Sequence, residues 1–260
     1  MNETPLRFEI DGAIARITLT RPASGNAIDV AMARALMDAA RKVDEDDTVR
    51  VVLLTGEGKL FCGGGDLRSF VEPGSSPSAV ISDITGYLHV AIARLARMNK
   101  PLVTAVNGPA AGAGLSLAAL GDIVLAARSA HFTLGYAGVG LVPDGGASWI
   151  LPRLIGLRRA QELILTNRRL SAQEAAEWGL ITRQVENEEF LAETDRVVDS
   201  LAAAATGALG AARRLLLSSF SASVETQMEM EARAISAAAR TPNGAEGITA
   251  FLEKRLPVFD

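Results

Sequence analysis

Two glycine-rich loops constrain this chain more than any other feature. The first is Phe61-Cys-Gly-Gly-Gly-Asp-Leu67 and the second is Asn107-Gly-Pro-Ala-Ala-Gly-Ala-Gly114. Each loop follows a short run typical of a β-strand, 51–55 and 102–106 respectively, and each leads into an apolar stretch of helical character. A glycine-rich loop that opens a helix leaves backbone N–H groups unpaired. Two such loops therefore predict a pair of N–H donors that converge on one oxygen atom.

A single acid follows the second loop, in the segment Gly140-Leu-Val-Pro-Asp144-Gly-Gly146. Its sequence neighbours are apolar residues and glycines, which isolates Asp144 from other charged groups. Two N–H donors and one carboxylate are the groups needed for proton transfer next to a carbonyl. A simpler alternative is that Asp144 caps the helix that follows it.

The residues around the glycines exclude the familiar nucleotide-binding motifs. The segment Gly112-Ala-Gly114-Leu-Ser-Leu117 has leucine where a dinucleotide-binding fingerprint needs glycine or alanine. No Gly-Lys-Ser/Thr sequence is present, which excludes a P-loop. A serine hydrolase is disfavoured because an α/β-hydrolase needs a histidine after its acid, whereas His89 and His131 both precede Asp144.

Length and composition describe an ordinary globular chain. Its 260 residues suit one large domain with a sizeable core. The net charge of −4 and the absence of a Lys/Arg cluster argue against a nucleic-acid partner. Cys62 is the only cysteine, so no Cys/His metal site is expected, and a reactive thiol there is disfavoured because no histidine adjoins it. We find no signal peptide or membrane-length apolar run, so we expect no membrane partner and a cytoplasmic location.

The order of predicted elements indicates an α/β fold. Runs 8–10 and 14–19 predict a β-hairpin, and helical spacing follows at 28–43 and 80–98. The strand-like run 123–127 continues the alternation of strands and helices, which is typical of α/β rather than segregated α+β folds.

From about Ser171 the pattern becomes almost entirely helical. Ser171-Ala-Gln-Glu174 is a capping box that opens a short helix. After a strand at 181–185, further helices are predicted at 188–205, 209–220, 224–240 and 245–255. We therefore expect residues 1–195 to form the core with the site and residues 196–260 to form a helical oligomerisation region, with packing onto the core as the alternative.

The motifs match a known family along nearly the whole chain. The matching segments are Arg21-Pro-x-x-x-Asn26-Ala27, both glycine-rich loops, Gly121-Asp-Ile, Leu141-Val-Pro-x-Gly-Gly146, Ser171-Ala-x-Glu-Ala and Glu246-Gly-Ile-x-Ala-Phe251-x-x-Lys-Arg255. On these residues the chain resembles the crotonase (enoyl-CoA hydratase/isomerase) superfamily. The resemblance implies a ββα superhelix, a C-terminal helical trimerisation region, acyl-coenzyme A thioester substrates and a homotrimer or dimer of trimers. Coenzyme A would enter as part of the substrate, and no separate cofactor is implied.

The resemblance also assigns residues to the site. It places the oxyanion hole at the backbone N–H groups of Gly65 and Ala113. It places coenzyme A along two segments and under the C-terminal helix, with contacts from Ala23, Asn26, Ala27, Asp66, Leu67, Arg68, Phe251 and Lys254. Tyr136 and Trp149 are expected to line the acyl pocket.

Two departures from the family pattern bear on the reaction. Hydratases of the family use two glutamates, which would fall at Ser116 and Tyr136 in this chain. A serine and a tyrosine cannot replace two carboxylates of tuned pKa, so we expect weak or absent hydration. Both residues remain expected contacts of the substrate.

Asp144 is the remaining acid and indicates two groups of relatives. Enoyl-CoA isomerases, including the ring-opening isomerase of phenylacetate breakdown, carry their catalytic aspartate in a similar Leu-x-Pro-Asp-x-Gly-Gly segment. The 4-chlorobenzoyl-CoA dehalogenases place a nucleophilic aspartate there, with a histidine matching His89 but a tryptophan where Tyr136 stands. An ordinary helix-face histidine is the alternative for His89.

We therefore predict double-bond isomerisation of an enoyl-CoA by an aspartate proton shuttle, in fatty acid metabolism or aromatic acid degradation. A dehalogenase-like hydrolase and a non-catalytic acyl-CoA-binding scaffold are the alternatives.

Overall fold

Two β-sheets form the core of the protein in this computed structural model, which describes residues 4–71, 74 and 76–260. The larger sheet has the strand order β1 (Leu6–Asp11), β2 (Ile14–Leu19), β3 (Val51–Gly56), β4 (Leu102–Val106), β6 (Ile123–Ala127) and β9 (Arg183–Val185). The predicted hairpin is confirmed: β1 and β2 are antiparallel, and each later pair in this sheet is parallel. The smaller sheet contains β5 (Ala110–Ala111), β7 (His131–Thr133) and β8 (Leu170–Ser171).

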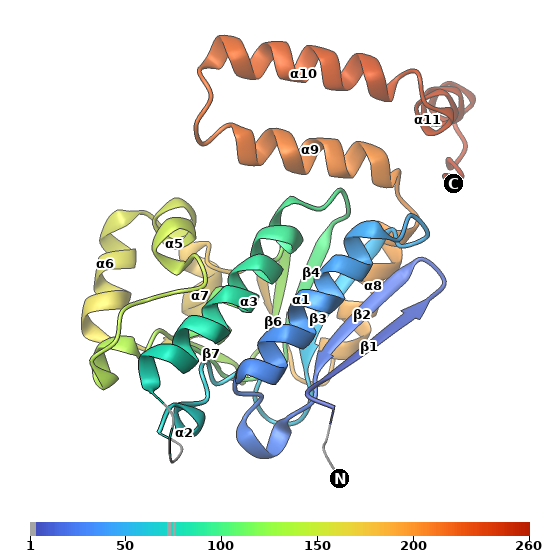
Figure 1. The fold of residues 1–260 in the computed structure, drawn as a ribbon. Coiled ribbons are helices and arrows are strands. Elements are labelled where there is room, and N and C mark those ends of the chain that lie inside the picture. Colours follow the sequence, from blue (N-terminus) through green and yellow to red (C-terminus); the bar gives the residue numbers. More distant parts are fainter. Residues whose placement is uncertain (1–3, 72–73, 75) are drawn as a thin grey trace.

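Helices cover both faces of the larger sheet. Helices α1 (Val30–Glu45) and α3 (Pro77–Arg97) lie side by side on one face, and α8 (Phe190–Ala202) lies on the other (Figure 1). On β3, Val52 and Leu54 pack into the core under α1 and α3, whereas Val51 and Leu53 pack with α8. The strand is therefore buried on both faces, which explains its continuous apolar sequence.

Helix α3 differs from the expectation that no segment could span a membrane. Within the described residues it has the length and composition of such a span. It packs against α1, however, and buries Ile84, Leu88, Ala91 and Leu95 in the core. Core packing accounts for the apolar residues on this buried face of α3.

The two glycine-rich loops lie side by side. The first connects β3 to the short helix α2 (Leu67–Phe70), and the second connects β4 to α4 (Ala113–Ala118). Ala111 donates its N–H to the carbonyl oxygen of Cys62 at 2.9 Å, within a parallel bridge between the loops. A Cβ atom on Gly114 would lie 2.2 Å from that same carbonyl, so only glycine permits this approach.

Shorter elements complete the core around the second loop. The 3-10 turns η1 (Pro22–Ser24) and η2 (Tyr136–Val139) precede α1 and α5, and helices α5 (Ala147–Ile155), α6 (Leu157–Thr166) and α7 (Ala172–Trp178) follow in chain order. The predicted capping box is confirmed, with the side chains of Ser171 and Glu174 each accepting the other's backbone N–H at the start of α7. The expected α/β fold is confirmed: the core consists of short strand and helix turns, and the C-terminal region is helical.

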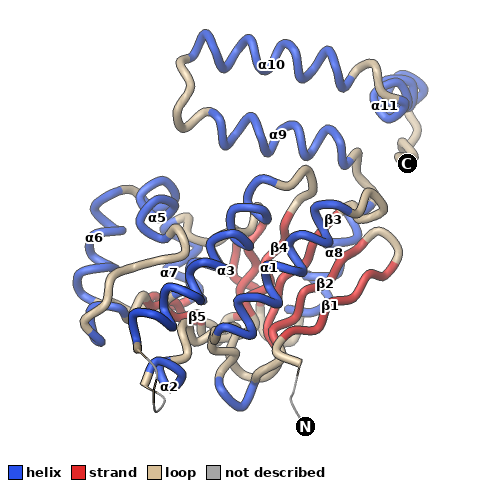
Figure 2. Tube along the Cα trace, in the orientation of Figure 1, coloured by secondary structure: helices blue, strands red, loops and turns tan. Residues whose placement is uncertain are grey.

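Three C-terminal helices extend beyond this core. Helices α9 (Thr206–Ser218) and α10 (Val224–Ala238) form an antiparallel pair, and α11 (Pro242–Glu253) lies at the end of α10 (Figures 1 and 2). The predicted boundary at 195/196 falls inside α8, whose residues Val197 and Val198 pack on the sheet. The change of character therefore comes after Ala202, and residues 196–202 belong to the core.

Candidate active site

A cavity of about 390 Å³ opens between the two glycine-rich loops, α3 and the segment that carries Tyr136 and Asp144. Thr85, Tyr136 and Asp144 supply its polar side chains. The other lining residues are apolar or glycine: Ile28, Gly63, Gly64, Gly65, Leu67, Phe70, Ile81, Ile84, Leu88, Ala111, Gly112, Ala113, Leu134, Gly135, Val139, Leu141 and Val142. The cavity therefore suits a ligand that is apolar over most of its surface and polar at one end.

Gly65 and Ala113, the two donors that the family resemblance assigns, both line this cavity. Neither backbone N–H donates a hydrogen bond to any residue that the structure describes. The reason at Gly65 is its pairing with Ile28, which engages the carbonyl of Gly64 and the N–H of Asp66 and leaves the N–H between them free. At Ala113 the reason is its place in the first turn of α4, where no preceding helical carbonyl is available.

Glycines set the backbone that carries these donors. Gly64 has φ +91°, and a Cβ atom there would lie 2.8 Å from the carbonyl oxygen of Ala111. Gly112, with φ +52°, precedes α4 directly. A positive φ is tolerated at low cost only by glycine, so these positions hold the two loops in contact.

Asp144 lies at the wall of the cavity, and two hydroxyl groups hold its carboxylate and its main chain. Tyr136 donates its phenolic O–H to Asp144 Oδ1 in a short hydrogen bond. Ser116 donates its hydroxyl to the main-chain carbonyl of Asp144 at 3.0 Å. The alternative that Asp144 caps the following helix is wrong, because Gly146 is the N-cap of α5 and no side chain caps it.

Burial keeps the Tyr136 phenol in its protonated form. Desolvation, followed by the negative charge of Asp144, raises the pKa of Tyr136 far above its usual value. The phenol is therefore protonated, and a hydrogen-bond donor, near neutral pH.

His89 lies on α3 beside the same carboxylate, outside the lining of the cavity. Its Nε2 accepts the N–H of Gly145 at 3.1 Å and lies 3.8 Å from Asp144 Oδ2. A ring nitrogen that accepts a hydrogen bond has no proton to donate, so Nε2 of His89 does not donate to Asp144 in this arrangement.

Cys62 is not available as a nucleophile. Its thiol is fully buried and contacts the carbonyl oxygen of Asn26 at 3.2 Å. Desolvation raises the pKa of Cys62 to about 12, so the reactive thiolate does not form near neutral pH.

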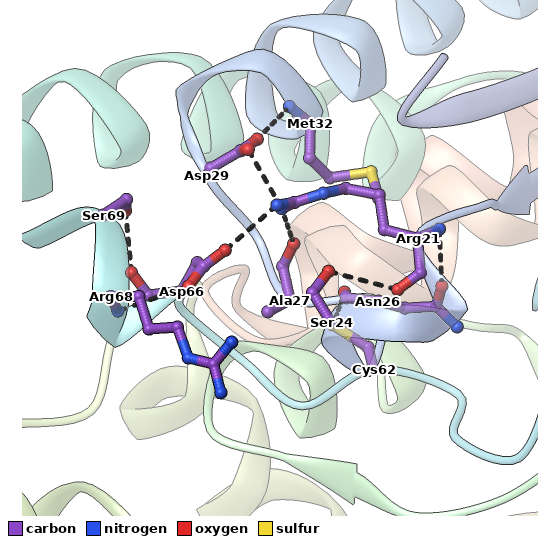
Figure 3. A network of polar contacts seen from close by, with 10 residues as sticks. All are labelled: Arg21, Ser24, Asn26, Ala27, Asp29, Met32, Cys62, Asp66, Arg68 and Ser69. Carbon is purple, nitrogen blue, oxygen red and sulfur yellow. Dashed lines mark hydrogen bonds and ion pairs between the residues drawn. The ribbon is translucent and has the colours of Figure 1, made fainter. Parts of the chain in front are cut away.

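Arg21 joins the two segments expected to hold coenzyme A. Its guanidinium lies 3.0 Å from the carboxylates of Asp29 and Asp66, one on each side. It also donates to the carbonyl oxygen of Ala27 at 2.6 Å, as Figure 3 shows. Arg21 belongs to the family motif, but the sequence alone did not predict that it links these segments. A charged residue at the end of a buried strand is the signal that could have suggested this.

The expected coenzyme A residues divide into exposed and internal ones. Ala23, Leu67 and Arg68 are exposed, and the guanidinium of Arg68 points away from the Arg21 network in Figure 3 and pairs with no described residue. The expectation for the Asn26 side chain is corrected, because it is fully buried and its amide donates to the carbonyls of Glu57, Leu60 and Phe61. The side chain of Ala27 is likewise buried, and Asp66 is engaged with Arg21.

Four other expected contacts lie outside the cavity. Ser116 is buried behind Asp144 and supports it, so its expected contact with substrate is corrected. Trp149 does not line the acyl pocket: its ring makes an edge-on contact with Phe220, with centroids 5.3 Å apart. Phe251 and Lys254 are exposed at the end of α11, which lies at the opposite end of the chain's fold from α2 (Figure 1). One chain alone therefore does not bring them to the cavity.

The sequence alone did not identify four cavity residues on α3. Ile81, Ile84, Thr85 and Leu88 form one wall of the cavity. Their spacing of three and four residues is that of one helix face, which is the signal that could have identified them.

Within the described residues, no group of three or more His, Cys, Asp or Glu side chains is placed to hold a metal ion.

Comparisons with known proteins agree with this geometry. The family model for enoyl-CoA hydratase/isomerase matches residues 9–260. The chain is 38% identical to 1,2-epoxyphenylacetyl-CoA isomerase of Escherichia coli (strain K12), over 96% of each protein. It is 33% identical to 4-chlorobenzoyl coenzyme A dehalogenase-2 of Arthrobacter sp, over 96% of this chain and 91% of the relative. It is 35% identical to a probable enoyl-CoA hydratase of Rhodobacter capsulatus, over 100% and 99% respectively.

A solved structure described as a putative enoyl-CoA hydratase/isomerase from Mycobacterium abscessus superposes with a TM-score of 0.94, at 32% identity and coverage of 98% and 99%. Together with the unpaired N–H groups and the shared motifs, these matches define the class of protein. The chain belongs to the enoyl-CoA hydratase/isomerase family of the crotonase superfamily, whose members act on coenzyme A thioesters.

Proposed function

We propose that this enzyme moves a carbon–carbon double bond in an enoyl-CoA, with Asp144 as the proton shuttle. The observation that carries the proposal is that one carboxylate and two unpaired N–H groups lie in the wall of the same largely apolar cavity. Tyr136 holds the carboxylate and Ser116 holds the main chain of Asp144. Similarity over 96% of the chain to a protein named as the isomerase of a coenzyme A thioester supports an isomerase reaction.

The reaction follows from these three groups. Asp144 takes a proton from the carbon next to the double bond, and the electrons of that C–H bond move into a dienolate whose charge rests on the thioester oxygen. The N–H groups of Gly65 and Ala113 stabilise that oxygen, by about 3 kcal/mol for each donor. Protonated Asp144 then returns the proton to the other end of the allyl system, so the carboxylate is regenerated and no other reactant is needed.

Hydration is a poor fit to the same site. It needs one group to activate water and another to deliver a proton. Among the described lining residues Asp144 is the sole carboxylate, and the hydroxyls of Ser116 and Tyr136 are both engaged with it. We expect hydratase turnover to be far slower than isomerisation, although several relatives are named as hydratases.

We further propose that the protein works as a homotrimer or a dimer of trimers. Helices α9–α11 expose many apolar side chains, among them Leu216, Ile235, Ile248, Phe251 and Leu252. Burial of such a surface favours association. A neighbouring copy would also supply Phe251 and Lys254 to coenzyme A, which a single chain does not.

The test is a panel of acyl-CoA thioesters, assayed for double-bond shift, hydration and halide release. We expect conversion of 3-enoyl-CoA to the conjugated 2-enoyl-CoA, and we expect Asp144→Asn to abolish it. A protein that binds acyl-CoA tightly and turns over none of the panel would instead be an acyl-CoA-binding scaffold.

A dehalogenase-like hydrolase is the second candidate, favoured by the 3.8 Å distance between His89 Nε2 and Asp144 Oδ2. In that reaction Asp144 would attack a 4-haloaryl ring and His89 would activate the water that frees the product. Halide release from 4-chlorobenzoyl-CoA with no double-bond shift in 3-enoyl-CoA would decide for this candidate.

A further inference from the structure

Tyr136 and Ser116 stand where hydratases of the family have their two glutamates, and in this chain both hydroxyls bond to Asp144. Tyr136 donates to one carboxylate oxygen and Ser116 donates to the main-chain carbonyl of the same residue. The contacts come from two different elements. Tyr136 of η2 contacts the carboxylate of Asp144, and Ser116 of α4 contacts its main chain. Two residues that cannot perform hydration thus share one partner.

The two oxygens of the carboxylate have different surroundings. Oδ1 accepts the phenol of Tyr136. Oδ2 accepts no hydrogen bond from any residue in the described part of the chain, and its near neighbour His89 has turned its Nε2 lone pair to the N–H of Gly145. Since a nitrogen that accepts cannot also donate, His89 leaves Oδ2 free.

We propose that Tyr136 is a positioning residue that occupies Oδ1 of Asp144 and thereby makes Oδ2 the single oxygen that takes and returns the substrate proton. This inference rests on the proposed isomerisation. The phenol keeps its proton throughout. Oδ2 gains the proton as the substrate C–H bond breaks, and it loses that proton when the new C–H bond forms, so charge and atoms balance without a further acid or base.

Isomerase kinetics of Tyr136→Phe provide the first test. Without the phenol the carboxylate rotates and its charged form loses a donor. We expect kcat to fall about tenfold to a hundredfold, because small misplacements of a reacting group cost rates of this size, with KM changed less than about threefold. The acidic limb of the pH–rate profile should move to higher pH by roughly one unit, because a lost hydrogen bond to the charged form favours protonation.

A substitution that makes the phenol a stronger hydrogen-bond donor should move the acidic limb of the pH–rate profile in the opposite direction. Difluorotyrosine at position 136 retains the shape of tyrosine but has a more acidic hydroxyl, so the acidic limb should move to lower pH. It also keeps the test informative if Tyr136→Phe folds poorly. The matched control is Tyr87→Phe, because the hydroxyl of Tyr87 contacts Arg34 at 2.9 Å on the surface, outside the cavity. This control should leave kcat and the pH profile unchanged.

A titration of ¹³C-labelled aspartate by NMR tests the contact without any turnover. The resonance of Asp144, assigned by its loss in Asp144→Asn, should titrate at higher pH in Tyr136→Phe than in the parent protein. An unchanged titration together with an unchanged kcat would overturn the inference, as would a rise in KM alone, which would make Tyr136 a simple substrate contact. If the parent protein moves no double bond, the proposed function fails, and the NMR titration still decides whether Tyr136 holds the carboxylate.

Discussion

The core and the helices α9–α11 differ in how far they bury their apolar residues. Strand β3 in the core buries Val51 to Leu54 completely or almost completely, between helices on both faces. Helix α10 buries no residue, and its Ile235 is 71% exposed. The core buries these strand residues within one chain, whereas helices with exposed apolar faces need a partner to bury them.

The cavity and the three groups at its wall lie in the core, and the C-terminal helices are attached to that core at few points. Arg213 of α9 is one attachment: it is 8% exposed, pairs with Asp122 at 2.7 Å and donates to the carbonyl of Lys100 at 2.7 Å. Trp149 and Phe220 form a second attachment, since α5, which follows Asp144 directly, contacts the end of α9 through them. This comparison predicts that some substitutions will lower turnover and others will weaken stability or oligomerisation, each without the other effect.

The largest effect is expected for Asp144→Asn. The amide keeps the shape of the side chain and can still accept the phenol of Tyr136, but it cannot take a proton from carbon. We expect isomerase turnover to fall by about three orders of magnitude or more, with the affinity for acyl-CoA and the oligomeric state unchanged. Steady-state kinetics measure the turnover, and light scattering measures the oligomeric state. Near-normal turnover would remove Asp144 from the mechanism.

Loss of one oxyanion donor should have the next largest effect. Gly65→Pro deletes the N–H, and we expect kcat to fall by at least about a hundredfold because the donor acts on the enolate more than on the ground state. Gly65→Ala is the matched control, since it keeps the N–H and brings a Cβ to 3.0 Å from the ring of Phe70. Equal losses in the two variants would indicate that crowding, not the missing donor, is responsible.

Removal of the Arg213 attachment should damage stability more than chemistry. Arg213→Ala leaves Asp122 and several carbonyl oxygens without their donor, and we expect the free energy of unfolding to fall by about 3 kcal/mol. Chemical denaturation measures this, and the exposed neighbour Arg214 provides the control, with an expected change within about 0.5 kcal/mol for Arg214→Ala. Equal effects of the two substitutions would contradict the assigned role of Arg213.

The smallest effect is expected for an exposed apolar residue of α10. Ile235→Lys places a charge on the face that we propose to be buried between copies, and the dissociation constant of the oligomer should rise at least about tenfold. Ile235→Leu should leave it unchanged. Sedimentation at several concentrations distinguishes the two. A parent protein that is monomeric at micromolar concentration would contradict the proposed trimer itself.

Local sequence was sufficient for most of the elements and for the two loops. The run at 51–54, the cap at Ser171 and the helix-breaking glycines each act through neighbours within a few residues, and the structure confirms all three. The existence of unpaired donors was predicted for the same reason, because a glycine-rich loop before a helix leaves its N–H groups unpaired wherever the loop lies. Their assignment to Gly65 and Ala113 came from the resemblance to the family.

Contacts between distant segments could not be predicted from local sequence. The sequence located Asp144 but not the phenol of Tyr136 on its Oδ1, and it expected Asn26 to face a ligand, whereas its amide is buried among carbonyls some thirty residues away. Trp149 was expected at the acyl pocket and packs on Phe220 instead. The side a residue faces depends on which elements the tertiary fold brings against it, and those partners lie far away in sequence. The sequence therefore determined which chemical groups this protein has, and only the tertiary structure decided which of them meet.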